Sequence, residues 1–215
     1  MKEPHFSPPI LSCEDINTYA EDFLRDHHAD NTLPIPIEEI LEFDLGLDIV
    51  PFPSLQRDFD IDGFISGDLT CIYVDDFIHQ NRPSRYRFTL AHEIGHLVLH
   101  KDLIESFRPL SIGDWKNFVL QVDDEVYDWL EWQAYTFAGL LLVPRRFLSK
   151  DFSLQIEALK SKIELVKSKN LPKDSYQEYI VNAVANKLIR TYDVSIYVLI
   201  KRISKEIEKG IFTIP

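Results

Sequence analysis

Cysteine is scarce in this chain, because only Cys13 and Cys71 occur among its 215 residues. A disulfide scaffold or a thiolate metal site needs several cysteines at short spacings, and two distant thiols do not meet that pattern. Both are interpreted as small apolar residues of a reducing compartment. The sequence therefore offers no sign of chemistry at sulfur.

Long apolar runs are missing as well. No segment approaches 18 consecutive apolar residues, and the opening MKEPHFS lacks the basic and apolar pattern of a secretory leader. We therefore expect a cytoplasmic protein that neither spans nor binds a membrane. Hydrophobic residues still make up 45% of the chain, which is enough to build a globular core.

Basic residues are in deficit, but unevenly. The chain has 23 Lys and Arg against 35 Asp and Glu, and of these residues 145–215 hold 14 basic and 8 acidic ones, a balance of +6. Residues 1–144 therefore carry −18. An acidic region disfavours direct contact with nucleic acid and favours a basic partner, although charged faces that only aid solubility are the simpler alternative. The length suits one domain or a catalytic domain with a small appended one, and we expect a catalytic domain at residues 1–144 with a helical subdomain at 145–215 packed on it.

Histidine and glutamate at helical spacing mark the candidate site. His92, Glu93 and His96 form an HExxH pattern. On a helix of 3.6 residues per turn, His92 and His96 lie one above the other, so their imidazoles can share one metal ion. Apolar residues on roughly the opposite side allow the same helix to dock into a core. The alternative is that both histidines belong to a solvated face.

The residue types in this pattern have a chemical reason. A zinc ion held by two imidazoles and a carboxylate keeps an open position for water, and it lowers the pKa of that water from about 15.7 to roughly 7. Glu93 is then placed to act as the general base. Gly95 lacks a side chain, so a substrate strand or the wall of the site could approach the helix closely there.

The third metal ligand is expected on a second helix, predicted over residues 124–143. Glu131 is the carboxylate near the middle of that helix, on the same side as Ala134 and Ala138, whose small side chains would let another helix approach. Zn²⁺ suits a set of two histidines and one glutamate best, and Mn²⁺ or another divalent ion is also compatible. Alternatively, Glu131 only faces solvent.

Three further residues are candidates for the stabilisation of a tetrahedral oxyanion or for contacts to the ligands: Tyr127, Tyr135 and His100. His100 follows His96 by four residues, but it lies about 12 Å along the helix axis from His92, so the three histidines cannot bind one ion. We expect His100 to cap the helix or to line the cleft.

The segments around the motif predict the rest of the fold. Three short strands, at 47–52, 61–66 and 70–75, are predicted to form a β-meander whose edge could pair with an extended substrate. Residues 102–122 are predicted to be irregular, with a short strand at 115–122, and to form a lid, a substrate-selecting wall or a plain connector. Residues 145–215 are predicted to form helices, and the pattern of residues 184–202 is similar to that of a helix-turn-helix. This pattern indicates either DNA binding or, in our preferred interpretation, a helical subdomain that recognises a partner protein.

Three segments together resemble the ImmA/IrrE family of metallo-endopeptidases: RFTLAHEIGH (87–96), EWQAYTFAGLLLVP (131–144) and the helix start at 194–195. The resemblance extends over about residues 12–210. It implies a cytoplasmic peptidase that cleaves a helix-turn-helix repressor and so releases genes for stress response or for induction of a prophage or conjugative element. It also implies His92, His96 and Glu131 as metal ligands and Glu93 as the catalytic acid and base.

One position departs from the family pattern. Four residues after the third ligand, the family usually has Asn or Asp, which can hydrogen-bond to a ligand histidine from behind. This chain has Tyr135 there. A phenol is a weaker acceptor, so the departure bears on metal affinity and activity.

We therefore predict an α+β protein in which a small β-meander sheet packs on a zincin-like helical core, followed by a helix-turn-helix-like C-terminal subdomain. The predicted function is that of a zinc-dependent endopeptidase that cleaves a transcriptional repressor of the helix-turn-helix (XRE) type. The alternatives are a non-catalytic regulator that binds a repressor or DNA, and the toxin of a toxin-antitoxin pair. Direct DNA binding is not expected.

Overall fold

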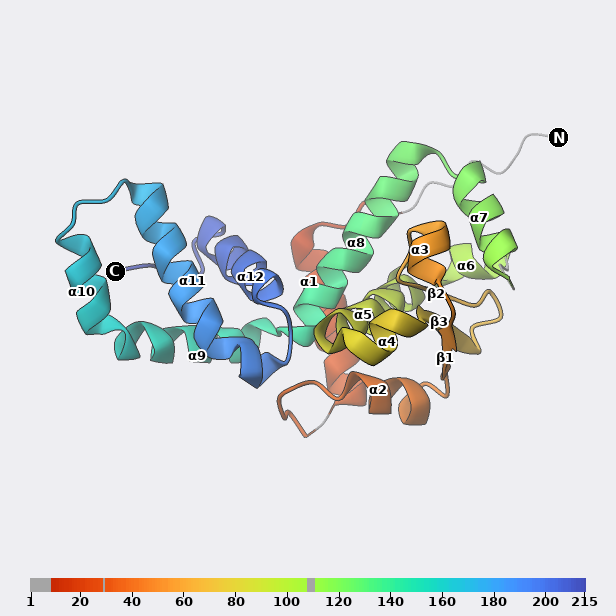
Figure 1. Ribbon diagram of the computed structural model, residues 1–215, viewed down its shortest axis with the longest axis horizontal. Helices are drawn as coiled ribbons and strands as arrows, with labels where there is room; N and C mark the ends of the chain where they lie inside the picture. Colours follow the sequence, from red (N-terminus) through yellow and green to blue (C-terminus); the bar gives the residue numbers. More distant parts are fainter. Residues whose placement is uncertain (1–8, 29, 108–110) are drawn as a thin grey trace. The chain divides into compact units, whose positions relative to one another are not determined.

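The computed structural model describes residues 9–28, 30–107 and 111–215. By its internal contacts the chain divides into two compact units, Met1–Leu141 and Leu142–Pro215, and each is described by itself below. Figure 1 labels the elements of both. In the described ranges, none of the helices combines the length and the apolar character needed to cross a lipid bilayer.

The first unit mixes helices with a small sheet, as the α+β prediction requires. Its elements in chain order are α1 (Cys13–His27), α2 (Ile37–Glu39), the π-helical turn η1 (Ile40–Asp44), β1 (Asp48–Phe52), α3 (Leu55–Phe59), β2 (Gly63–Ile65), β3 (Cys71–Asp75), α4 (Asp76–Asn81), α5 (Pro83–Leu99), α6 (Lys101–Phe107), α7 (Ile112–Gln121) and α8 (Asp124–Leu142).

The sheet is mixed, so the prediction of a β-meander was wrong. The strand order is β1-β3-β2, with β1 parallel to β3 and β2 antiparallel to β3. A meander would need a tight turn between β1 and β2. Instead, α3 intervenes, bounded by Ser54 and Asp60 in the left-handed conformation (φ 58° and 60°), and β2 joins the far side of β3. As a result β2 is an edge strand, and β3 buries Ile72 and Val74 completely at the centre.

Two helices, α5 and α8, pack closely at Gly95. A Cβ atom on Gly95 would lie 3.0 Å from Cα and 3.1 Å from the carbonyl oxygen of Ala134, and 3.3 Å from Cβ of Phe137. The close approach predicted for Gly95 is therefore an approach of α8, and not of a substrate strand. Ala134 permits the approach from the other side, as its small side chain indicates. This contact sets the spacing of the two helices that carry the candidate ligands.

We expect the substitution Gly95→Ala to destabilise the metal-free protein by about 1–3 kcal/mol, because the backbone of α8 would have to move away. The higher helix propensity of alanine, about 1 kcal/mol, offsets only part of this cost. Urea unfolding of both proteins measures the difference. Gly113→Ala on α7 is the matched control, since its new Cβ would meet only the Ser111 hydroxyl at 3.6 Å. A Gly95→Ala protein as stable as the wild type would contradict the packing argument.

Residues 102–122 are largely helical, so the prediction of an irregular segment with a strand at 115–122 was also wrong. Helices α6 and α7 occupy most of it, while residues 108–110 lie outside the described part of the chain. A capping interaction starts α7, because the Ser111 hydroxyl accepts from the backbone N–H of Asp114 and donates to its carboxylate.

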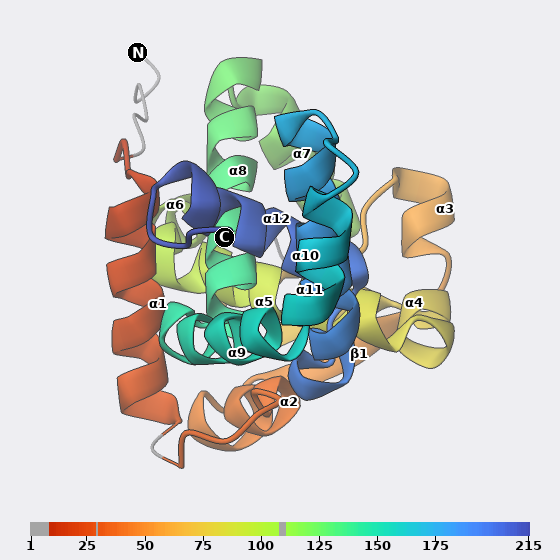
Figure 2. The same cartoon turned by 90° about the vertical axis from the view of Figure 1, so that its left-hand side faces the viewer.

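The second unit is a set of helices: α9 (Arg145–Ala158), α10 (Lys160–Lys167), α11 (Lys173–Tyr192) and α12 (Ile196–Glu208). Figure 2 shows these helices face on. A short turn with Asp193 in the left-handed conformation joins α11 to α12. Glu206 of α12 is fully buried, and its carboxylate pairs with Arg145 at 2.9 Å and with Arg202 at 2.7 Å. The inner face of α12 therefore packs in the core of this unit.

Candidate metal and catalytic site

Three side chains from α5 and α8 converge on one point. The Nε2 atoms of His92 and His96 are 3.0 Å apart, and the two carboxylate oxygens of Glu131 lie 3.3 Å from His92 Nε2 and 3.2 Å from His96 Nε2. The helical spacing places both imidazoles on one face of α5, and the contact at Gly95 brings α8 within reach. The three side chains keep only 12%, 17% and 25% of their surface exposed.

This donor set fits a divalent metal ion. Bonds of about 2.0–2.2 Å to imidazole nitrogen and carboxylate oxygen, at tetrahedral angles, put neighbouring donor atoms about 3.3 Å apart. The observed separations of 3.0–3.3 Å match this value. A divalent ion between these atoms would accept a lone pair from each of them. Among the described residues, one group of at least three His, Cys, Asp or Glu side chains has donor atoms close enough to share an ion, and it is this cluster.

Glu93 lies beside this cluster in the same pocket and is almost completely buried. Burial raises the pKa of the Glu93 carboxyl to about 7; the charge of His96 and a hydrogen bond from the Ile65 backbone N–H oppose the shift, and the Glu131 charge adds to it. A carboxyl group whose pKa is close to neutral can both accept and return a proton at physiological pH.

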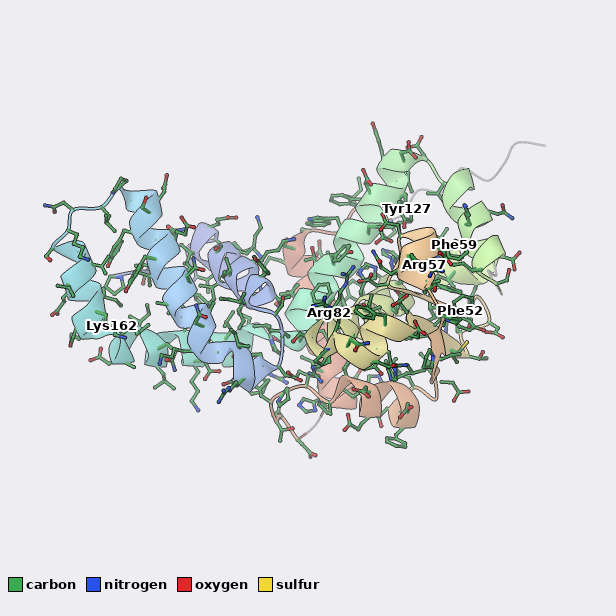
Figure 3. The ribbon with its side chains drawn as sticks, in the orientation of Figure 1. Phe52, Arg57, Phe59, Arg82, Tyr127 and Lys162 are labelled. Carbon is green, nitrogen blue, oxygen red and sulfur yellow. The ribbon has the colours of Figure 1, made fainter. Side chains whose placement is uncertain are left out.

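Glu131 behaves differently from Glu93. Burial would raise the pKa of the Glu131 carboxyl, but the hydrogen bonds and the charges of His92 and His96 outweigh it and hold the pKa well below its usual range. Tyr127, labelled in Figure 3, lies one turn earlier on α8 than Glu131 and lines the same pocket. Burial and the charges of Glu131 and Glu93 raise the pKa of this phenol, so it stays protonated and is a hydrogen-bond donor. The two carboxylates are therefore suited to different tasks, one to bind a cation and one to carry a proton.

Tyr135 contacts the cluster through its ring. It is half exposed, and its ring lies 4.5 Å from that of His92 and is stacked on Phe88. Burial of the hydroxyl and the Glu131 charge raise the pKa of Tyr135. Tyr135 also lines the pocket, together with Trp115 of α7 and residues of β2, α5 and α6.

His100 ends α5, and its backbone N–H donates to the His96 carbonyl at 2.8 Å. It also lines the pocket, in agreement with both roles expected from the sequence. Its Nδ1 is 3.0 Å from Nδ1 of His96, and its Nε2 is 3.2 Å from Oε1 of Gln133. Burial and the charge of His96 lower the pKa of His100 to about 3. Gln133, whose side chain is fully buried, is the residue that the sequence analysis missed.

Residues 44–204 match the Peptidase_M78 family, described as an IrrE N-terminal-like domain. The chain belongs to this family. The match includes all of α5 and α8, and therefore every residue of the cluster, and it confirms the resemblance to the ImmA/IrrE peptidases. The chain thus carries a domain of a metallopeptidase family together with a His-His-Glu cluster able to hold a divalent ion.

The fold is also similar to that of a solved structure, a Mycobacterium tuberculosis transcriptional regulator, with a TM-score of 0.52 and 18% sequence identity. The similarity covers 89% of this chain and 46% of the regulator, so the chain spans about half the length of that protein. At this identity the likeness supports the α+β fold alone. No curated protein matches the chain significantly.

Proposed function

We propose that this IrrE N-terminal-like domain protein is a zinc-dependent endopeptidase that cleaves a transcriptional repressor of the helix-turn-helix type. The observation that carries the proposal is the convergence of His92, His96 and Glu131 with Glu93 beside them in one pocket. Membership of a metallopeptidase family supports the reaction class. We assign His92, His96 and Glu131 as the metal ligands and Glu93 as the catalytic acid and base.

The roles of the side chains follow from their positions. A divalent ion bound by the cluster would supply a Lewis acid for the scissile carbonyl and would acidify a water molecule. Glu93 takes the proton of the attacking water and returns it to the leaving amine nitrogen. Tyr127 and Tyr135 are the candidates to donate a hydrogen bond to the tetrahedral oxyanion. His100 is not a candidate for this role, because both of its ring nitrogens already have hydrogen-bond partners.

The pocket also suits an extended, basic segment of a protein substrate. The edge strand β2 contributes Gly63 and Ile65 to the pocket wall, and an edge strand can bind an extended backbone by β-augmentation. The pocket lining includes Asp60 and Asp62, of which Asp62 pairs with Arg85, also a lining residue. The balance of −18 in residues 1–144 favours positively charged segments, which DNA-binding proteins have.

The test is to incubate the zinc-loaded protein with a helix-turn-helix repressor encoded beside its gene and to analyse the products by mass spectrometry. We expect two discrete fragments, no cleavage after chelation, and recovery when Zn²⁺ is added back; Mn²⁺ in place of Zn²⁺ tests the identity of the ion. A repressor that is bound but stays intact at every metal loading would favour a non-catalytic regulator. Growth arrest on expression of this protein alone would favour a toxin.

A further inference from the structure

A series of hydrogen bonds, buried at its centre, leads away from the cluster to Pro9. It runs from His96 Nδ1 to His100 Nδ1 (3.0 Å), from His100 Nε2 to Gln133 Oε1 (3.2 Å) and from Gln133 Nε2 to the Pro9 carbonyl (3.0 Å). Only 3% of His100 and none of Gln133 is exposed. Buried polar groups in such a series depend on each other, because each can be satisfied only if its neighbour has the complementary role.

The donor and the acceptor of each hydrogen bond follow from the Pro9 end of the series. The Pro9 carbonyl can only accept, so the Gln133 amide NH₂ faces it and Gln133 Oε1 must face His100 as an acceptor. His100 Nε2 therefore carries the proton, and Nδ1 of the neutral ring is an acceptor. The remaining bond then requires a proton on His96 Nδ1, which leaves the lone pair of His96 on Nε2, the atom that faces Glu131 and His92.

We propose that His100, held by Gln133, is a positioning residue that fixes the tautomer and the ring orientation of His96 for metal binding. This inference rests on the proposed function, since it requires His96 to be a ligand. His100 approaches this ligand histidine from the C-terminal end of the same helix. Within the described residues, Nδ1 of His92 is buried without such a partner, so the series acts on one ligand alone.

Four variants separate this role from simple packing. His100→Leu removes the acceptor, whereas His100→Asn keeps one, because Oδ1 of Asn occupies the place of Nδ1 in histidine. Gln133→Met removes the acceptor for His100 at nearly constant volume. His79→Leu, an exposed histidine on α4 outside the pocket, is the matched control. For each protein we would measure the zinc Kd by competition with a chromogenic chelator, the d–d absorption spectrum of the Co²⁺ form and the melting temperature of the metal-free form.

We expect His100→Leu to raise the zinc Kd roughly 10- to 100-fold, as loss of a hydrogen-bond partner behind a metal ligand typically does, and to change the Co²⁺ spectrum. His100→Asn should recover most of the affinity, Gln133→Met should lose part of it, and the control should match the wild type. If the wild type binds Zn²⁺ and His100→Leu does so with equal affinity and an unchanged spectrum, this inference alone is overturned. The inference is also overturned if His100→Leu loses zinc affinity together with a lower melting temperature and His100→Asn does not restore that affinity. A wild type that binds no metal overturns the proposed function as well.

Discussion

The Glu93→Gln variant is expected to bind zinc like the wild type and to cleave the repressor 10²- to 10⁴-fold more slowly, which is the usual contribution of a general acid-base group. Glutamine keeps the volume of Glu93 in a site where the side chain is almost completely buried, but it cannot accept a proton from water. Single-turnover cleavage assays give the rate, and elemental analysis gives the metal content. Glu125→Gln, an exposed residue at the start of α8, is the matched control.

The outcome distinguishes the models of function. Equal rates in Glu93→Gln and wild type would remove Glu93 from the mechanism. Relief of repression in cells that is the same for both proteins would show that regulation does not need hydrolysis. A variant that has lost zinc together with activity would instead mean that Glu93 contributes to the metal site.

The same substitution should stabilise the metal-free protein at high pH. Burial raises the pKa of Glu93 from 4.5 to about 7 in the folded state, so folding favours the protonated carboxyl. The wild type therefore loses stability as the pH rises from 4.5 through 7, by up to about 3 kcal/mol at 1.36 kcal/mol per pKa unit. Glutamine stays neutral, so the metal-free variant should be more stable than the wild type at pH 8 and equally stable at pH 4. Urea unfolding at the two pH values in the presence of a chelator measures this difference.

Replacing Glu131 by alanine is expected to abolish both metal binding and cleavage. The two imidazoles alone would leave the ion without its carboxylate, and the charge that attracts it would be lost. Zinc at a thousandfold excess over its Kd should stabilise the wild type by about 4 kcal/mol, because it binds only the folded state, whereas Glu131→Ala should show no zinc-dependent shift in melting temperature. Asp128→Ala, an exposed acidic residue on the same helix, should retain the shift.

This experiment is independent of any substrate. His92→Ala should behave like Glu131→Ala, because each removes one of the three converging donors. A Glu131→Ala protein that still contains about one zinc per chain after purification would show that the metal lies elsewhere. It would contradict the proposal that the cluster binds the ion tetrahedrally.

The convergence of His92, His96 and Glu131 could be predicted because it depends on local rules. The spacing i, i+4 determines which residues share a helical face, and the position of Glu131 relative to Ala134 indicates the side of α8 that approaches another helix. The contacts behind these residues could not be predicted. Gln133 is two residues from Glu131 on the same helix, and nothing in its neighbourhood indicates that its amide meets His100 and Pro9, since those pairings arise only when distant segments pack together.

The two errors in the fold have different causes, one local and one in the pairing of strands. Pro109 and Gly113 are typical of breaks and favour an irregular segment at 102–122, whereas Ser111 and Asp114 have the spacing of a capping pair and start α7 in the structure. The strands were located within two residues of their observed ends, but their order was not. Strands adjacent in sequence usually pair, and here the short helix α3 redirects β2 to the other edge of β3.

The distribution of tryptophan provides a probe of the two units. All three tryptophans, Trp115, Trp129 and Trp132, belong to the unit Met1–Leu141, and the last two stack on α8 with ring centroids 4.6 Å apart. Indole fluorescence therefore reports on the unit that holds the His-His-Glu cluster, while the unit Leu142–Pro215 contributes tyrosine emission only. Far-ultraviolet circular dichroism reports the helices of both. Denaturation curves from the two signals should coincide if the units unfold together, and they should separate if each unfolds by itself.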